Sequence, residues 1–158
     1  METDRLVKEL RDERDAFFRV LDAVAPGSMT TPGLLGEWSA RDLIAHLGYW
    51  AGHGVESIHA VETGRAEEFG ADRLPVDDVN ATVVRVARQA ELDTVRKREA
   101  ASVEAFVERL RAMDPALLAT SLPHHGLTLD QGIREDGAAH YRGHAEELRR
   151  VLEERPRG

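Results

Sequence analysis

Apolar residues recur every three or four positions along four segments of this sequence, and no segment alternates apolar with polar residues as a half-buried strand does. This spacing predicts an all-α fold, and a four-helix bundle is the simplest way to bury four such apolar faces. The third segment carries two apolar stripes on nearly opposite sides, so we expect a break or kink near residues 90–93. The expected helices cover residues 3–24, 39–63, 76–113 and 129–154.

Capping residues and helix breakers mark the ends of these segments. Pro26 ends the first helix, because proline cannot continue the hydrogen-bond ladder. Ser39 with Asp42, and Thr128 with Gln131, have the spacing of capping boxes, which satisfy the first backbone N–H groups of a helix. Surface loops are therefore expected at residues 27–37, 64–75 and 121–126.

The length and charge of the chain limit its organisation and its partners. We expect a single domain over residues 1–158, with a formal net charge of −8. Nucleic acids and anionic membranes both attract positive surfaces, so we expect neither as a partner. No apolar run approaches the length that spans a bilayer, and the first residues lack the basic-then-apolar layout of a secretory signal. These features predict a cytoplasmic protein.

The sequence contains no cysteine. Disulfide bonds, thiolate metal ligands and a cysteine nucleophile are therefore excluded. If the protein carries out thiol chemistry, the thiol must come from another molecule.

Two histidines stand one helical turn apart in the last predicted helix. His140 and His144 are neighbours on one helix face because residues four apart lie above one another. Both lie on or beside the apolar side, whereas histidines needed only for solubility would lie among the charged residues opposite. Two imidazoles in this arrangement can bind one metal ion, but the same spacing also occurs between ordinary core or interface histidines.

A third histidine far upstream strengthens the metal hypothesis. His46 lies at the edge of the apolar arc of the second predicted helix. Three neutral imidazoles suit zinc, nickel or iron(II), and they leave coordination positions free for water or a substrate. The pattern Trp38-Ser-x-x-Asp-Leu-x-x-His46, together with His140-Tyr-Arg-x-His144, resembles the DinB-like family. That family also includes thiol-dependent S-transferases and the N-terminal domain of mycothiol-dependent maleylpyruvate isomerases.

The resemblance covers nearly the whole chain, including the segment from Val76 to Asn80. It implies a four-helix bundle in which His46, His140 and His144 bind one divalent metal ion in a cavity between helices. It also implies a low-molecular-weight thiol, of the mycothiol or bacillithiol class, as a co-substrate. By the same resemblance, Asn80 is a candidate for the cavity lining.

Other side chains near the three histidines are candidates for the site. Trp50 and His53 follow His46 on the same predicted helix and are candidates for the cavity lining, although Trp50 also fits an ordinary core position. Asp136 and Glu147 lie close to the predicted ligand face and can accept an imidazole N–H, although a solvated position fits them equally well.

Three further histidines are expected outside the site. His124 and His125 lie in a loop that contains proline and glycine, where histidines are usually exposed to solvent. His59 points away from the apolar arc of its helix and is also expected to be solvated.

Three functions remain open from the sequence, each with a small molecule as substrate or ligand. The first is a metal-dependent transferase that adds a low-molecular-weight thiol to an electrophile. The second is a metal-dependent hydrolase that uses the same ligands with water as the nucleophile. The third is a bundle that binds or sequesters a small molecule without chemistry. The amphipathic first helix and the changed apolar stripe of the third fit a homodimer interface, and packing within one chain explains them as well.

Overall fold

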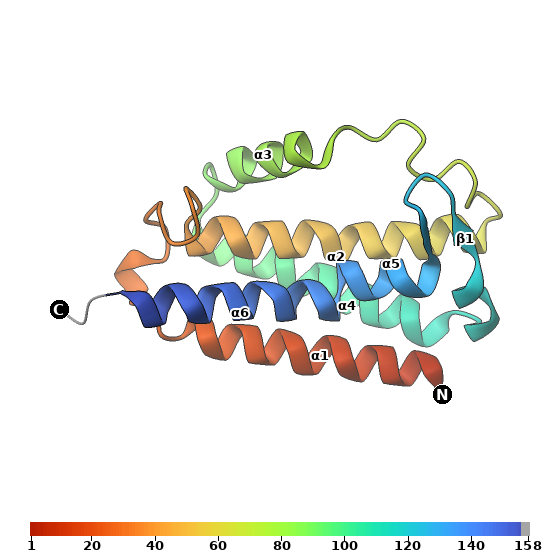
Figure 1. The fold of residues 1–158 in the computed structure, drawn as a ribbon, viewed down its shortest axis with the longest axis horizontal. Coiled ribbons are helices and arrows are strands. Elements are labelled where there is room, and N and C mark those ends of the chain that lie inside the picture. The colour runs from red at the N-terminus through yellow and green to blue at the C-terminus, as the bar shows by residue number, and fades with distance from the viewer. Residues whose placement is uncertain (156–158) are drawn as a thin grey trace.

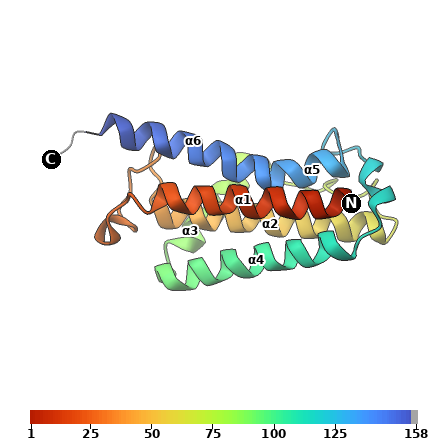
Figure 2. The ribbon, with the colours of Figure 1, turned by 90° about the horizontal axis from the view of Figure 1, so that it is seen from below.

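The computed structural model describes residues 1–155, and its helices run side by side along the long axis of the molecule (Figure 1). α2 packs against α4, and α1 packs against α6 (Figure 2). The predicted all-α bundle is therefore confirmed. The bundle consists of α1 (Glu2–Leu21), α2 (Ala40–Glu62), α4 (Leu92–Ala112) and a column formed by α5 (Leu129–Asp136) and α6 (Ala138–Glu154).

The predicted break in the third helical segment is also confirmed, because α3 (Val76–Ala87) and α4 are separate helices. α3 lies outside the bundle against α2 (Figure 1), with Val84 buried and Val86 exposed. Arg88 follows α3 and donates hydrogen bonds of 3.3 Å to Asp42 Oδ2 at the start of α2. This contact ties the turn after α3 to the N-terminus of α2.

The last predicted helix is not continuous. α5 ends at Asp136, and α6 begins at Ala138 after Gly137, which has φ −116° and ψ −111°. A Cβ atom at Gly137 would lie 2.9 Å from the carbonyl oxygen of Ile133 and 3.3 Å from Leu10, so this close approach requires glycine. The prediction of one unbroken helix was wrong. α5 and α6 follow one another along nearly the same line (Figure 1). The apolar spacing of the sequence is therefore not interrupted at the break.

The shorter elements lie at the ends of the bundle. The antiparallel hairpin of β1 (Ser121–Leu122) and β2 (Leu127–Thr128) occupies a segment predicted as a loop, since two-residue strands are too short to show alternation. Two 3₁₀ turns cover Pro26–Ser28 and Pro115–Ala119. Within residues 1–155, no helix is both long and apolar enough to cross a membrane.

A buried ionic contact fastens three of the helices together. Glu99 on α4 accepts hydrogen bonds from Arg14 on α1, at 2.6 and 2.7 Å, and from the Tyr141 hydroxyl on α6, at 2.8 Å. Burial and the charge of Glu99 raise the pKa of Tyr141 well above its ordinary value, so its hydroxyl remains a donor. This contact fixes the rotation of α6 about its own axis. It therefore also fixes the direction in which the side chains next to Tyr141 point.

The contact between α2 and α4 leads to a prediction about two glycines on α2. A Cβ atom at Gly54 would lie 3.0 Å or less from three ring carbons of the buried Phe106, whereas a Cβ at Gly52 would have its nearest neighbour at 3.9 Å. Gly54→Ala is therefore expected to lower the free energy of unfolding by about 1–3 kcal/mol. The matched variant Gly52→Ala should raise it by about 0.5–1 kcal/mol, because alanine favours the helix. Urea denaturation measures both changes, and equal effects would contradict the close approach at Gly54.

Candidate metal centre

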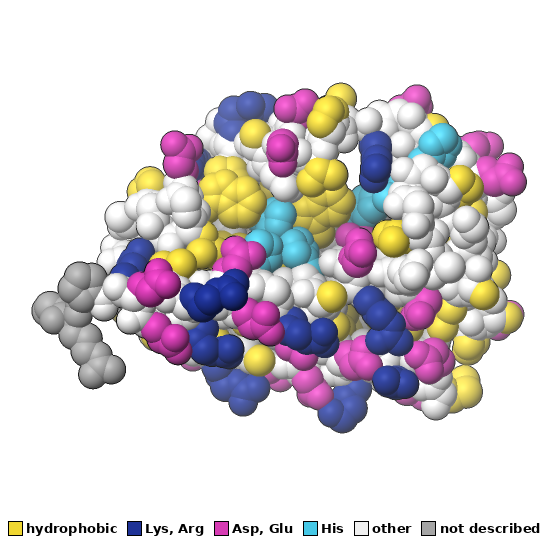
Figure 3. All heavy atoms as spheres, in the orientation of Figure 1, with side chains coloured by type: hydrophobic (Ala, Val, Ile, Leu, Met, Phe, Trp, Pro, Cys, Tyr) yellow, Lys and Arg dark blue, Asp and Glu magenta, His cyan; other side chains and the backbone are white. Residues whose placement is uncertain are grey.

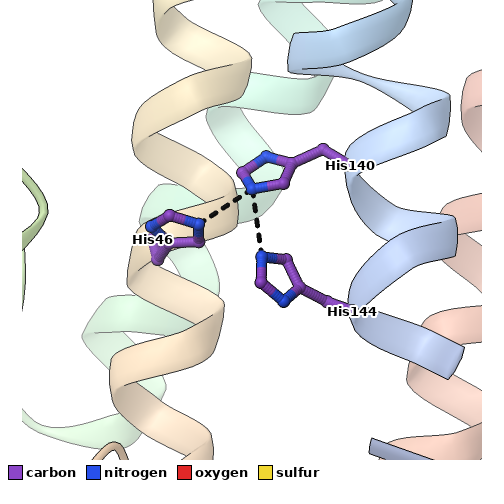
Figure 4. Close-up of side chains that lie close together, drawn as sticks. All are labelled: His46, His140 and His144. Carbon is purple, nitrogen blue, oxygen red and sulfur yellow. Dashed lines mark hydrogen bonds between the residues drawn. The ribbon is translucent and has the colours of Figure 1, made fainter. Parts of the chain in front are cut away.

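Three histidine side chains converge between α2 and α6. His46 extends from α2, and His140 and His144 extend from successive turns of α6 (Figure 4). The Nε2 atom of His140 lies 2.8 Å from that of His46 and 3.1 Å from that of His144. One ring nitrogen from each residue falls within 4.8 Å of the others, so the three can hold a single metal ion.

Local sequence features place these side chains. The predicted capping box is present, with the Ser39 hydroxyl accepting from Asp42 N at 3.1 Å and Asp42 Oδ2 accepting from Ser39 N at 3.0 Å. It fixes the start of α2 and therefore the direction in which His46 points. On α6, the buried Tyr141 turns toward Glu99, which leaves the neighbouring His140 facing α2.

The environment keeps the three imidazoles neutral. His46 is only 5% exposed, and the Trp38 ring lies 4.8 Å from it between centroids. Burial, together with the charges of the neighbouring imidazoles, lowers the pKa of His46 to about 4 and that of His140 to about 3. Burial also lowers the pKa of His144. A neutral imidazole keeps a lone pair for a metal ion, so the site suits a cation at neutral pH.

The hydrogen-bond pattern fits a bound metal ion. The Nδ1 atoms of His46, His140 and His144 are buried and have no hydrogen-bond partner among residues 1–155. If each Nδ1 carries the proton, the three Nε2 lone pairs point at one another, which is unfavourable without a cation between them. Three nitrogen donors are suitable ligands for zinc, nickel or iron(II). The structure brings together the three predicted ligands, and the metal itself stays a prediction.

The three histidines line a cavity of about 470 Å³. In the space-filling view, histidine side chains lie in a hollow between large hydrophobic side chains in the middle of one face (Figure 3). The structure places all three predicted lining residues, Trp50, His53 and Asn80, in the wall of this cavity. Trp50 Nε1 donates to Asn80 Oδ1 at 2.9 Å, which joins α3 to α2 beside the histidines.

The structure gives the two acidic candidates different surroundings, and each fits one of the two alternatives that the sequence left open. Asp136 does accept an imidazole N–H, but its partner is His53 Nδ1, at 2.7 Å, and not a predicted metal ligand. The break at Gly137 separates Asp136 from α6, so the helical spacing to His140 does not hold. Glu147 lies 3.6 Å from His144 Nδ1, which is too long for a hydrogen bond, and it is 49% exposed.

His125 was predicted to be exposed, and this prediction was wrong. Its ring stacks on Phe69, with centroids 4.9 Å apart and planes 17° apart, and it lines the cavity. Burial lowers the pKa of His125 to about 4, and both of its ring nitrogens lack a hydrogen-bond partner among residues 1–155. His124 and His59 are exposed, as expected.

Sequence reasoning missed two charged residues of the cavity, Arg73 and Glu135. Arg73 lies in the loop before α3 and lines the cavity near His125, and its charge adds to the effect of burial in lowering the pKa of His125. A single arginine in a polar loop carries no periodic signal. Only the path of the loop over α2 brings it to the site.

A comparison with known protein families matches residues 10–135 to the mycothiol maleylpyruvate isomerase N-terminal domain. The match covers most of the chain and includes His46 and Asn80, but it ends before His140 and His144. No curated protein and no solved structure matches the chain. The chain therefore belongs to the mycothiol maleylpyruvate isomerase N-terminal domain family, within the DinB-like superfamily that its histidine pattern resembles.

Proposed function

We propose that this protein is a metal-dependent transferase that joins a low-molecular-weight thiol, of the mycothiol or bacillithiol class, to a small electrophile. The convergence of three neutral imidazoles at the wall of an open cavity carries this proposal. His46, His140 and His144 would hold a divalent cation there, and the cation would supply Lewis acidity that lowers the pKa of a thiol or water molecule.

The residues around the histidines support such chemistry. Trp38 packs on His46, and Trp50 lines the next part of the cavity wall, so two large aromatic side chains flank the histidines. Asn80 holds the indole N–H of Trp50 and keeps that ring in place against α3.

One observation favours a thiol over water as the nucleophile: the description of the matched family names mycothiol, which is a thiol. Because the chain has no cysteine, the sulfur atom would enter the cavity as part of a separate molecule. With water as the nucleophile, the same three histidines would serve a hydrolase.

The test is turnover by protein loaded with zinc, nickel or iron(II), with mycothiol and one of two electrophiles, ethyl acrylate or monochlorobimane. We expect a thioether product, detected by mass spectrometry, whose formation stops when the metal is removed by a chelator. Consumption of the electrophile in the absence of a thiol would contradict the proposal and indicate a hydrolase. Tight binding of an electrophile that is released unchanged would contradict the proposal and indicate a binding protein.

A further inference from the structure

A second group of polar side chains lies in the same cavity, away from the three histidines. His53 Nδ1 and Asp136 Oδ2 are 2.7 Å apart, and the two side chains are only 20% and 13% exposed. His53 comes from α2 and Asp136 from the last turn of α5, so the contact joins two columns of the bundle. A carboxylate bonded to one imidazole nitrogen orients the ring and stabilises its protonated form.

The remaining nitrogen of His53 is free to meet a ligand. No residue among 1–155 forms a hydrogen bond with His53 Nε2, and the ring lies in the cavity wall between Trp50 and Phe69, at centroid distances of 5.0 and 5.2 Å. Among the histidines that line the cavity in the described part of the chain, His53 alone has a carboxylate within hydrogen-bond distance.

The position of His53 separates its role from that of the three converging histidines. It follows His46 by seven residues on α2, which places it about 10 Å further along the helix axis. Its nearest aromatic neighbours are Trp50, Phe69 and His125, and none of these is a predicted metal ligand. A molecule that extends from the three histidines along the cavity therefore reaches His53 with its far end.

We propose that His53 is a catalytic proton donor to the electrophile, and that Asp136 is a positioning residue that holds it; this role rests on the proposed transferase function. The pair suits substrates in which negative charge develops on an atom other than the one that sulfur attacks. The donor is the doubly protonated ring, whose Nδ1–H is bonded to Asp136 and whose Nε2 gives its proton to that charge.

The proton balance shows where such a donor is needed. When a thiol adds to an activated alkene, the sulfur lone pair forms the S–C bond and the π electrons move onto the electrophile. His53 gives its proton to this anion, and the proton lost by the thiol returns to His53 through solvent, so the adduct contains every atom of both reactants. When a thiol displaces chloride, the C–Cl electron pair leaves with chloride and the thiol proton goes to solvent. Displacement therefore needs no proton donor.

Other charged and titratable groups surround the pair. Burial raises the pKa of Asp136, and the hydrogen bond from His53 opposes this rise. Glu135 is next to Asp136 on α5, and His125 faces His53 from the hairpin with ring centroids 5.3 Å apart. Arg73 comes from the loop before α3. Asp136 is the one of these that holds the His53 ring through a hydrogen bond.

The kinetic test compares the two electrophiles in His53→Gln, Asp136→Asn and the control His59→Gln, an exposed position on the same helix. His53→Gln should slow the addition of mycothiol to ethyl acrylate by about a hundredfold through kcat, while the rate of chloride displacement from monochlorobimane changes less than about twofold. Asp136→Asn should affect addition in the same direction, and His59→Gln should affect neither reaction. Metal content, measured by elemental mass spectrometry, should stay unchanged in all three variants.

Two further readouts separate the possible failures. In ¹⁵N NMR spectra, the neutral His53 ring of the wild-type protein should carry its proton on Nδ1, and Asp136→Asn should remove this preference for one tautomer. Equal slowing of both reactions, or loss of metal in His53→Gln, would overturn the proton-donor role while leaving the transferase in place. A wild-type protein that forms no thioether from either electrophile would overturn the transferase and this role together.

Discussion

Replacing His140 with alanine should weaken the binding of divalent metal by more than about a hundredfold. His140 is the central member of the cluster, because its Nε2 atom lies within 3.1 Å of the Nε2 atoms of both His46 and His144. Without it, two imidazoles on different helices remain, and a two-ligand site loses most of the advantage of a preformed geometry. Competition against a chromophoric chelator, with elemental mass spectrometry for stoichiometry, measures the change.

The control for this variant is His124→Ala, which removes an imidazole from an exposed position in the hairpin. It should keep the wild-type metal affinity, which excludes non-specific binding to surface histidines. Circular dichroism melting of His140→Ala should show a folded protein, since the Tyr141 and Glu99 contact that anchors α6 is untouched. Unchanged metal affinity in His140→Ala would remove this residue from the ligand set.

Acid should destabilise the metal-free protein. His46 has a pKa of about 4 in the folded protein and an ordinary value of 6.5 when unfolded, so between these values the unfolded state binds more protons. The stabilisation linked to His46 is therefore complete above pH 6.5 and is lost as the pH falls toward 4. The expected loss from this residue is about 3 kcal/mol. His140, with a pKa of about 3, acts in the same direction to still lower pH.

Urea denaturation of chelator-treated protein between pH 7.5 and pH 4.5 measures this loss. His46→Gln, which cannot gain a proton, should show a clearly smaller dependence on pH over the same range. Bound metal should delay the acid effect, because protons must first displace the cation from the imidazoles. An identical pH dependence in the wild type and in His46→Gln would show that His46 is not the group responsible.

Short-range features of the sequence account for the parts of the fold that were predicted correctly. The capping box of Ser39 and Asp42 and the apolar spacing of α2 depend on residues within one or two helical turns. The same local geometry puts His140 and His144 on one face of α6. The change of apolar stripe also revealed the break between α3 and α4, since a helix that turns its apolar face must change its packing partner.

Parts of the site lay beyond such reasoning, because they depend on how distant elements pack. Asp136 was expected near His140, but the break at Gly137 and the packing of α2 place it within hydrogen-bond distance of His53 instead. His125 was expected in solvent, but the loop after α2 brings Phe69 onto its ring. Neither contact produces a periodic pattern in the sequence from which it can be predicted.

Residue types and local periodicity therefore specified the helices, the histidine pair on α6 and the need for an external thiol in any thiol chemistry. The joining of His46 to that pair was inferred from a family resemblance, and packing between α2 and α6 is what brings the three Nε2 atoms together. The pairing of His53 with Asp136 and the cavity that contains both sites arose from packing alone. The reason is physical: backbone geometry sets which residues of one helix share a face, whereas contacts between helices depend on the fit of whole apolar surfaces.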